Sequence, residues 1–479
     1  MNVKLKISIW IFVLVLFATT LPAYASSTVN LDSEVTKKIT SSSVSVSLRK
    51  ASDGKLVYSF NGDIKRKPAS NLKLLTGAAS LQVLGESYRY KTELYIDGLL
   101  FHSSLYGNVY VKGSGDPTLQ YSDLEMFAQI LKGYGIEKIY GDIYGDDTYF
   151  SGEELTPGIK KIDESDYFAA RTSALVLSPT EEFDAATIVV EVSPTEIGQN
   201  GSYKVIPNIS GMSITNLTKT VKGNEENTIE VKRRFRSNEI ILSGNIPMHD
   251  ISKKWVTVHD PTINTLHAMK AALSEQGILI NKDSIVTRKK VPKNATRIYT
   301  KRSQTLKEMM PVFMKLSNNS MADIFVKTLG AEVYGVGETN TGLKVLREYG
   351  EQIRINTTDW TFEDGSGMSH RNRVTANSLT SLLFKVQGAS SYETFFHSLP
   401  VGGQKERLIG GTLRNRFKDS TLLNRVVAKT GNIEGVYTLS GYITTMENNH
   451  YIFSIMTENG TREAIKEIDD IVWHIIKKY

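Results

Sequence analysis

A serine and a lysine three residues apart could form a nucleophile and its base. Ser70 and Lys73 lie in the stretch KPASNLKLLTGAASL (residues 67–81), where Pro68 leads into a run with apolar residues at helical spacing. On a helix the two side chains share one face, one turn apart, so the hydroxyl and the amine can meet. A serine near a helix start followed by a solvated lysine is also a common chance pairing, so the pair alone assigns no reaction.

Two further short signals follow in the chain. The stretch LSNNS holds Ser317 and Asn319 in an S-x-N arrangement, and AKTGN places Lys429, Thr430 and Gly431 at the end of a predicted strand. In the order S-x-x-K, S-x-N, K-T-G, the three signals match the set that active-site serine acyl transferases use on penicillins and D-Ala-D-Ala peptides. The conjunction predicts that Ser70 is a nucleophile.

The residue types suit acyl transfer. Ser70 needs a base, and Lys73 can serve only when neutral, so its pKa must fall from about 10.4 toward 7, a shift of roughly 4 kcal/mol. Burial and a nearby cation such as Lys429 could supply that shift together. We expect Ser317 to relay the proton to the leaving amine and the Asn319 amide to hold the substrate peptide.

The third signal suits a substrate terminus. Lys429 and Thr430 on an edge strand could bind a terminal carboxylate, and Gly431 would leave room for the ligand backbone. The backbone N–H groups of Ser70 and Asn432 would form an oxyanion hole.

The surrounding elements predict a mixed α/β (α+β) fold. Alternation predicts a hairpin before Ser70 and three strands near the C-terminus, at 43–49, 56–60, 425–431, 436–445 and 450–458. Apolar residues on one face of the last segment predict a helix that covers a sheet, the alternative being a helix on a membrane surface. Short β-like runs fill residues 90–290, and helices return from about residue 300. This order suggests one domain inserted into another.

Composition narrows the function classes. The first 25 residues combine Lys4 and Lys6, an apolar run and AYA, so we read them as an export signal cleaved after Ala25, with an uncleaved anchor as the alternative. The chain has no cysteine, hence no disulfides. The net charge of +6 is mild and interspersed, which disfavours nucleic acid as a partner. The eight histidines show no ligand spacing, so we expect no metal, and nothing implies a cofactor.

Segments spread over nearly the whole mature chain carry a family resemblance. The chain resembles the class C low-molecular-mass penicillin-binding proteins, the D-alanyl-D-alanine carboxypeptidase/DD-endopeptidases of peptidoglycan, in PASNLKLLT (68–76), GSGDPTL (113–119), GDDTYF (145–150), DGSGMSHRNRVTA (364–376), GGTLRNRF (410–417) and AKTGNIEGVYTLSGY (428–442).

The resemblance implies a division into domains and a set of partners. A penicillin-recognising catalytic domain, an antiparallel sheet covered by helices, is expected at 26–88 and 285–479. A β-rich inserted domain is expected at 89–118 and 200–284, and a third domain, nested within it, at 119–199. The implied partners are peptidoglycan stem peptides and β-lactams, and the implied location is exported, peripheral to the membrane or wall.

The resemblance also implies a pocket for the acyl-donor side chain, and the chain departs from the family at two positions. Asp163 and Tyr167 in IDESDYF are expected to grasp the ammonium and stem of a diaminopimelate-like residue. Asn318 stands where the family usually has Asp, at a position whose side chain is not needed for catalysis in the family picture. Asn432 replaces a Thr whose hydroxyl would lie near the substrate carboxylate.

Two other functions remain open at this point. A serine β-lactamase shares these motifs but must release its acyl group quickly, and the large insertion argues against it. A non-catalytic wall-binding or penicillin-sensing protein would keep the cleft without turnover, and Asn432 is the one feature in its favour. The segment DGSGMS lacks the G-x-S-x-G pattern, so we interpret Asp364–Gly367 as a structural turn at the cleft.

Overall fold

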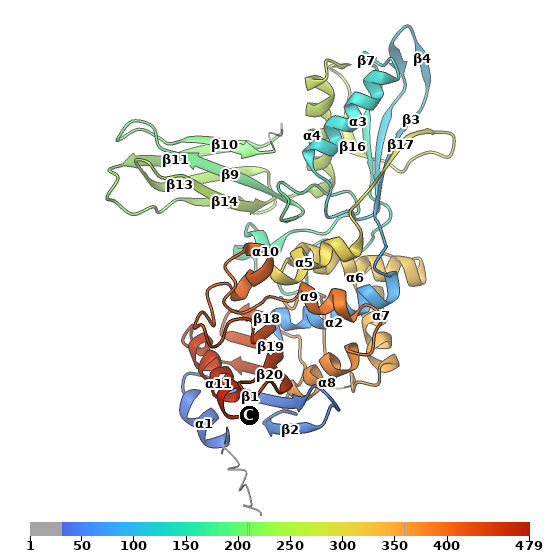
Figure 1. Cartoon of the computed structure of the whole chain (residues 1–479). Helices are drawn as coiled ribbons and strands as arrows, with labels where there is room; N and C mark the ends of the chain where they lie inside the picture. The colour runs from blue at the N-terminus through green and yellow to red at the C-terminus, as the bar shows by residue number, and fades with distance from the viewer. Residues whose placement is uncertain (1–30, 208, 210, 359) are drawn as a thin grey trace, which may run out of the picture.

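The structure is a computed structural model that describes residues 31–207, 209, 211–358 and 360–479. The expected export signal at residues 1–25 and its cleavage after Ala25 lie outside the described residues. Among the residues described, no helix combines the length and the apolar character needed to cross a membrane. The ribbon forms a lower body built from both ends of the chain and two upper projections built from its middle (Figure 1).

The lower body contains a five-stranded antiparallel sheet. Its strand order is β18-β19-β20-β1-β2, so the two ends of the chain meet where β1 pairs with β20. The strands are β1 (Ser43–Lys50), β2 (Leu56–Phe60), β18 (Val426–Ile433), β19 (Val436–Thr444) and β20 (His450–Glu458). All five predicted strands are therefore present, with bounds that differ by at most two residues.

Helices cover both faces of this sheet. Val44, Val46 and Leu48 of β1 point to one face, where they share a core with α11 (Ala464–Lys478) and α1 (Leu31–Lys38). The alternate Ser47 points to the other face and bonds Thr380 of α8 (Ala376–Val386) at 2.9 Å. The C-terminal helix thus covers the sheet, as predicted. The remaining helices of this body are α2 (Lys73–Leu84), α5 (Leu306–Lys315), α6 (Asn319–Tyr334), α7 (Thr339–Gln352), α9 (Tyr392–Ser398) and α10 (Arg407–Gly410).

One upper projection, called here the outer unit, is built around a second five-stranded sheet. Its order is β16-β8-β6-β3-β17, with β8 parallel to both β6 and β16. The strands are β3 (Lys91–Ile96), β6 (Val109–Gly113), β8 (Ile143–Asp146), β16 (Val286–Arg288) and β17 (Thr296–Arg302). A smaller sheet, β15-β7-β5-β4, lies at its far end, made of β4 (Leu99–Phe101), β5 (Ser104–Tyr106), β7 (Lys138–Ile139) and β15 (Leu279–Ile280). Helices α3 (Tyr121–Gly133) and α4 (Pro261–Glu275) pack beside one another in this unit (Figure 1).

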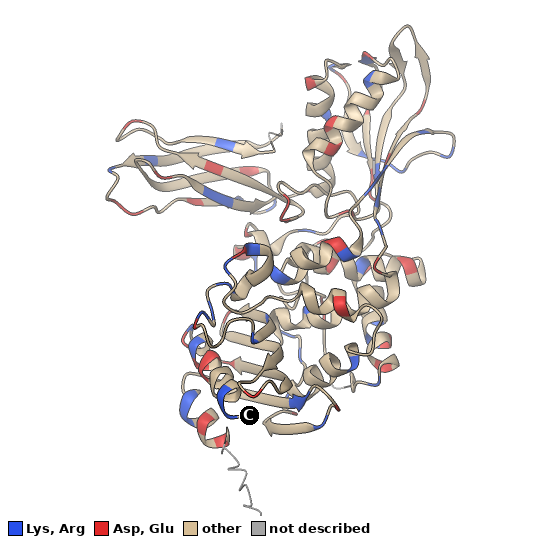
Figure 2. Cartoon of the chain, in the orientation of Figure 1, with Lys and Arg blue, Asp and Glu red and all other residues tan. Residues whose placement is uncertain are grey.

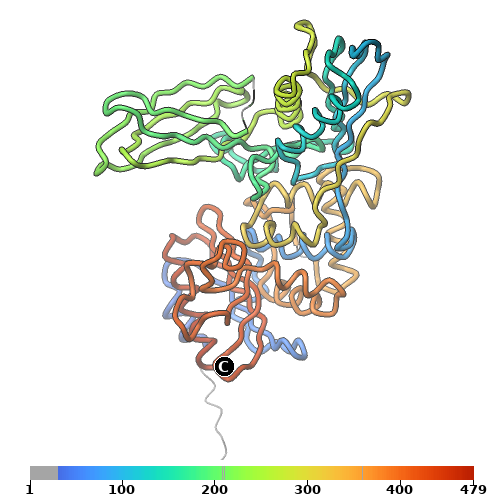
Figure 3. The backbone as a smooth tube through the Cα atoms, turned by 45° about the horizontal axis from the view of Figure 1, so that its top comes forward, coloured from blue at the N-terminus to red at the C-terminus, as the bar shows by residue number. Residues whose placement is uncertain are grey.

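The other projection, called here the inner unit, is all β and spans residues 187–257. It contains two three-stranded sheets, β10-β9-β14 and β11-β13-β12. Its strands are β9 (Thr187–Ser193), β10 (Ser202–Ile206), β11 (Ser213–Val221), β12 (Glu230–Arg233), β13 (Glu239–Pro247) and β14 (Ser252–Thr257). The tube in Figure 3 shows this unit, in green, extending sideways from the rest of the chain.

These pairings correct the expected domain boundaries. The segment 119–199 is not a nested domain, because α3 and β8 belong to the outer unit and β8 joins β6 to β16. The nested segment is instead 187–257. The outer unit also keeps β16 and β17, so the chain returns to the lower body near α5 rather than at residue 285. Short strands with parallel, long-range partners carry no local signal of which strand they join.

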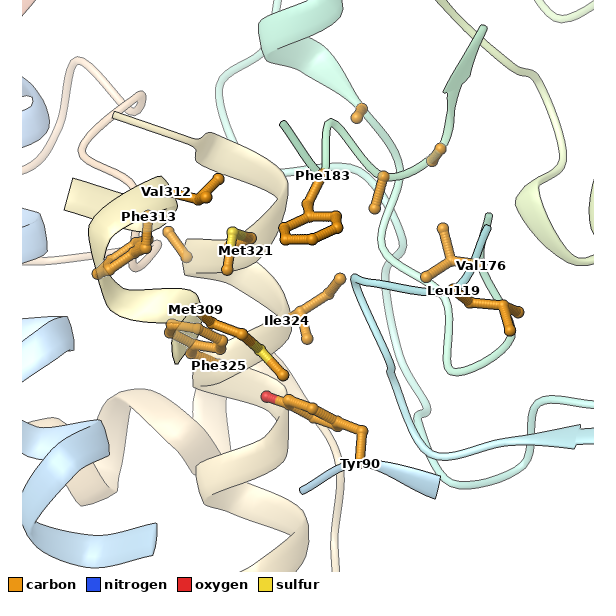
Figure 4. Packing of buried hydrophobic residues seen from close by; sticks show 14 of the residues in the cluster. Tyr90, Leu119, Val176, Phe183, Met309, Val312, Phe313, Met321, Ile324 and Phe325 are labelled. Atoms are coloured by element: carbon orange, nitrogen blue, oxygen red, sulfur yellow. The ribbon is translucent and has the colours of Figure 1, made fainter. Parts of the chain in front are cut away.

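A continuous apolar core joins the upper units to the lower body. Phe183, from the segment that precedes β9, lies beside Met321 and Ile324 of α6, and Tyr90 approaches the same helix from the start of β3 (Figure 4). Acidic and basic residues are interspersed over all three parts of the ribbon (Figure 2). The units are thus held on the body by burial rather than by a block of opposite charge.

Candidate active site

A cleft lies between the sheet of the lower body and a segment that comes from the upper units. Its volume is about 680 Å³. One wall is the end of β18, the floor holds the 3-10 helix η1 (Ala69–Leu72) and the loop before α6, and the other wall is the segment 158–168. The lining residues are Ser70, Gly158, Ile159, Lys160, Ile162, Asp163, Tyr167, Phe168, Leu316, Ser317, Asn319, Met368, His370, Thr412, Thr430, Asn432, Ile433 and Glu434.

Ser70 is placed by a tightly packed turn. It lies on η1, directly before α2, and its neighbour Asn71 donates a hydrogen bond to Ser440 of β19 at 2.6 Å. Gly367 packs against the Ala69 carbonyl so closely that a Cβ there would lie 1.8 Å from the oxygen. The helix that follows has no solvent-facing side through Leu81, because every residue from Lys73 to Leu81 is buried. The sequence predicted a single apolar stripe, whereas the whole first half of α2 is enclosed.

Lys73 is the base candidate, and it contacts Ser70 directly. Its Nζ lies 2.9 Å from Ser70 Oγ, 2.7 Å from Asn319 Oδ1 and 2.7 Å from the Ser366 carbonyl. The side chain is fully buried. All three contacts are to uncharged oxygens, so none of them neutralises an ammonium.

Burial lowers the pKa of Lys73 to about 7, and the charges of Asp323 and Asp364 oppose that shift. A pKa of about 7 agrees with the value that Lys73 needs to take the proton of Ser70. The two carboxyl groups are themselves buried, and burial raises the pKa of each above its usual range. Burial is the largest cause of the lowered pKa of Lys73. The sequence suggested burial together with a nearby cation such as Lys429.

Ser317 and Lys429 form a second hydroxyl–amine pair across the cleft. Lys429 Nζ donates to Ser317 Oγ at 2.8 Å and to the Thr430 carbonyl at 2.8 Å. Burial, with the charge of Lys73, holds the pKa of Lys429 well below its usual value. Ser317 has a positive φ of 60°, an uncommon conformation for a non-glycine residue that occurs often at functional sites.

Asn319, the first residue of α6, links Lys73 of α2 to the cleft wall. Its Oδ1 accepts from Lys73, and its Nδ2 donates to the Phe168 carbonyl at 3.2 Å. Both ends of the amide are therefore engaged by protein groups. Asn319 holds Lys73 in place, a role that the sequence analysis did not anticipate.

Asn318, the departure from the family's Asp, has a structural role. Its Oδ1 caps α6 by accepting from the Met321 N–H at 3.0 Å. Its Nδ2 donates to the Glu182 and Phe183 carbonyls at 3.0 and 2.9 Å. An amide can do both because it carries an acceptor and a donor.

The K-T-G strand lies on the opposite wall. The Thr430 hydroxyl bonds Thr412 at 2.8 Å, and Asn432 is exposed and lines the cleft. Gly431 is buried, and a Cβ there would lie 2.2 Å from Thr438 Oγ1 and 2.9 Å from the Pro68 carbonyl. The missing side chain thus lets β18 pack against the Ser70 turn. Room for a ligand backbone beside Gly431 stays a prediction.

Asp163 and Tyr167 line the cleft on the wall contributed by the inserted region. They end and begin two short 3-10 helices, η2 (Lys161–Asp163) and η3 (Tyr167–Ala169). On the same wall, Lys160 pairs with Glu434 of the opposite hairpin at 2.6 Å. Thus all ten residues named from the sequence either line the cleft or contact a residue that does.

The sequence analysis missed three groups next to Lys73. Ser366 acts through its carbonyl, and Asp364 holds that turn by accepting from the backbone N–H groups of Gly367 and Ser369, both at 2.6 Å. Asp323 accepts from Gly365 N at 3.3 Å. The segment DGSGMS was correctly interpreted as a turn at the cleft. A backbone carbonyl has no signature in a sequence, so its contact with Lys73 could not be predicted.

Known proteins resemble the chain over most of its length. A D-alanyl-D-alanine carboxypeptidase from Actinomadura sp. (strain R39) is 32% identical over 423 residues, which are 88% of this chain and 78% of the relative. The D-alanyl-D-alanine carboxypeptidase DacB of Haemophilus influenzae is 22% identical over 447 residues, 90% of this chain and 88% of the relative.

The fold also matches a solved structure. The crystal structure of penicillin binding protein 4 (dacB) from Haemophilus influenzae superposes with a TM-score of 0.79 at 21% identity, over 94% of this chain and all of that one. This likeness confirms the expected penicillin-recognising fold. A family model also matches residues 28–478. With Ser70 lining its cleft and the buried Lys73 in contact with Ser70, the chain belongs to the D-Ala-D-Ala carboxypeptidase 3 (S13) family.

Proposed function

We propose that the protein is a serine D-alanyl-D-alanine carboxypeptidase that forms an acyl-enzyme on Ser70 and is acylated by penicillins. The observation that carries this proposal is the 2.9 Å contact between Ser70 Oγ and the Nζ of a fully buried Lys73. A lysine whose pKa is about 7 is neutral in half of the molecules at neutral pH, so it can accept a proton from the hydroxyl.

The reaction starts with proton transfer from Ser70 to neutral Lys73. Ser70 Oγ attacks the carbonyl carbon of the penultimate D-Ala, and the oxyanion is held by the backbone N–H groups of Ser70 and Asn432. As the C–N bond breaks, Ser317 gives its hydroxyl proton to the leaving amine of the terminal D-Ala, and Lys73 passes to Ser317 the proton that it took from Ser70. Water hydrolyses the ester, which frees Ser70.

The contacts around the cleft suggest how each part of the substrate is held. Lys429 and Thr430 bind the terminal carboxylate, which supplies the negative charge that the buried Lys429 lacks among its hydrogen-bond partners. Asp163 and Tyr167 line the opposite wall, in position for the ammonium and stem of a diaminopimelate-like side chain. Asn319 orients Lys73 and, through Phe168, the wall as well.

The same chemistry extends to cross-linked peptides. In a cross-link the leaving amine belongs to the side chain of a second stem peptide, and a cleft of about 680 Å³ has room for a branched leaving group. We therefore include DD-endopeptidase activity. Because peptidoglycan lies outside the cytoplasmic membrane, the proposed location is extracytoplasmic, at the membrane or wall.

The test uses a peptide that ends in D-Ala-D-Ala and a fluorescent penicillin. The wild-type protein should release D-alanine and become covalently labelled, and Ser70→Ala should do neither. Ser80→Ala is the matched control, because Ser80 lies buried on the same helix and its hydroxyl bonds only the Thr76 carbonyl at 2.8 Å. Labelling that persists in Ser70→Ala would place the nucleophile elsewhere. Labelling of the wild type without release of D-alanine would favour a penicillin sensor.

A further inference from the structure

The cleft wall that carries Asp163 and Tyr167 is built onto the inner unit. Between these two residues, Asp166 forms an antiparallel bridge with Val256 at the end of β14. Thr257 then bonds the same segment twice, with its N–H to the Ser165 carbonyl at 3.1 Å and its Oγ1 to the Glu164 carbonyl at 2.6 Å. The wall is therefore attached to the edge strand of this sheet, β14, by one β-bridge and two hydrogen bonds.

The second sheet of the inner unit holds the same segment through a buried arginine. Arg233, the last residue of β12, donates to the Glu164 carbonyl at 3.2 Å and to the Thr257 carbonyl at 2.9 Å. Its guanidinium also lies 3.4 Å from the Glu164 carboxylate, and both side chains are only 2% exposed. Arg171 completes the cluster with a 2.8 Å contact to the same carboxylate oxygen, Oε1 of Glu164.

A buried ion cluster of this kind is better suited to fixing geometry than to adding stability. Removing two charges from water offsets much of their attraction, so the net gain is small even where the contacts are good. The bonds to main-chain carbonyls, however, fix the path of residues 164–166 relative to both sheets. The neighbouring Arg234 provides a contrast, since it is 61% exposed and pairs with Glu239 at the surface.

The wall leads directly to the catalytic amine. Phe168, one residue after Tyr167, accepts from Asn319 Nδ2, and Asn319 Oδ1 accepts from Lys73. Before the wall begins, the chain is fixed to α6, where Lys327 donates to the Ser151 and Glu153 carbonyls at 3.0 and 2.7 Å. Asp163 and Tyr167 lie between the contacts of Lys327 and the contact of Phe168 with Asn319. Within this stretch, the buried Glu164 attaches the chain to the inner unit.

We propose that Arg233 and Thr257 are positioning residues through which the inner unit sets the selectivity of the cleft for the acyl side chain of the substrate. They act through Glu164 and Ser165 and touch no substrate. The inference rests on the proposed function, because it assigns a task to a wall of the same site. The inner unit, drawn in green to the left in Figure 1, is then a support for specificity rather than a separate module.

The test compares two acyl donors in two variants. Thr257→Val keeps the shape of the side chain and removes the bond to Glu164, and Arg233→Met removes the guanidinium. One donor is a stem peptide with diaminopimelate before D-Ala-D-Ala, and the other is 6-aminopenicillanic acid, which has no acyl side chain. Both variants should lose about tenfold or more in kcat/KM for the peptide, mainly through KM, since displacement of a positioning contact is costly. Acylation by 6-aminopenicillanic acid should change less than about twofold, because this compound has no acyl side chain for the wall to bind.

The controls separate positioning from general damage. Arg234→Met should leave both reactions unchanged. If Arg233→Met does not fold, the charge-matched Glu164→Gln/Arg233→Met variant replaces it, and Thr257→Val carries the same expectation by itself. Equal losses with both donors, or no loss with either, would overturn the inference. A wild-type protein that 6-aminopenicillanic acid does not acylate would instead overturn the proposed function.

Discussion

Lys73 and Lys429 are both fully buried, and each places its ammonium nitrogen on a serine hydroxyl: Lys73 on Ser70 at 2.9 Å and Lys429 on Ser317 at 2.8 Å. Neither amine has a carboxylate among its hydrogen-bond partners. Burial lowers the pKa of both amines, and the charge of Lys73 lowers that of Lys429 further, because a like charge in a low-dielectric site raises the cost of ionisation. Lys73, whose pKa burial lowers to about 7, is thus available as a base when a substrate carboxylate binds at Lys429.

The pH dependence of acylation should report Lys73. Its pKa is about 7 in the folded protein, and only the neutral amine can take the Ser70 proton. The rate of acylation by a penicillin should therefore rise with pH, about tenfold per unit below pH 6, and level off above a midpoint of about 7. Stopped-flow fluorescence with a labelled penicillin between pH 5 and 9 measures this profile.

The lowered pKa of Lys73 also determines how its contribution to the stability of the fold changes with pH. The pKa of Lys73 is lower in the folded protein than in the unfolded chain, so the unfolded chain binds more protons between the two values. The contribution of Lys73 to stability should thus be least favourable below pH 7 and improve as the pH rises toward 10.5.

An acylation rate that is flat from pH 5 to 9 would contradict the assignment of Lys73 as the base.

Asn432 gives a prediction about efficiency. It is exposed at the cleft wall, where the family usually has Thr, and its backbone N–H is the proposed oxyanion donor. Asn432→Thr restores a hydroxyl near the substrate carboxylate without altering that N–H. A hydrogen bond to a charged group contributes about 1.5–3 kcal/mol, and partial exposure reduces this, so kcat/KM for D-alanine release should rise about three- to tenfold.

The matched control for that change is Asn432→Val, which has the shape of Thr without its hydroxyl. It should stay at or below the wild-type rate. If Asn432→Val gains as much as Asn432→Thr, the gain comes from removing the Asn side chain and the hydroxyl has no role. Steady-state kinetics on one D-Ala-D-Ala peptide distinguishes the two cases.

The catalytic body could be predicted from the sequence because its signals are local. The alternation in residues 43–49 specifies one apolar face, and Val44, Val46 and Leu48 do enter one core. The three motifs carry their own residue types, so their order was enough to gather Ser70, Ser317 and Lys429. The inserted units could not be divided correctly, because β8 is four buried residues long and joins partners at 109–113 and 286–288. Nothing in those four residues specifies either partner.

The cleft shows the same limit. The motif residues that act through their side chains were found. Ser366, which offers only its carbonyl to Lys73, and the carboxyl groups of Asp323 and Asp364 were not connected with Lys73. Arg233 was also missed, because its importance comes from a contact between segments 69 residues apart. Gly431 was singled out for the absence of a side chain, and the structure adds a second reason for it, the close approach of Thr438 and the Pro68 carbonyl.

The last prediction concerns Asn318, where the usual family residue should be harmful in this chain. The Nδ2 group of Asn318 faces three oxygens: the carbonyls of Glu182 and Phe183 and, at 3.3 Å, Oδ1 of Asp184. Burial, with the charge of Glu182, raises the pKa of Asp184 to about 7. Asn318→Asp would replace the donor with an acceptor beside that carboxyl group, so one of the two acids must hold a proton.

Asn318→Asp should therefore unfold more easily, and more so at high pH. A buried polar group that loses its partner costs about 1–3 kcal/mol, which corresponds to a fall of several degrees in the thermal midpoint at pH 8. Carboxyl groups with raised pKa values bind protons more tightly in the folded protein than in the unfolded chain, so stability falls as the pH rises and the loss should be smaller at pH 5.5. Thermal melts at the two pH values measure both effects.

Asn356→Asp, at an exposed turn where the side-chain oxygen is the acceptor, should change little. Asn318→Asp combined with Asp184→Asn should recover most of the loss, because the donor returns from the other side of the pair. A double variant no more stable than Asn318→Asp alone would show that the contact between residues 318 and 184 is not the cause.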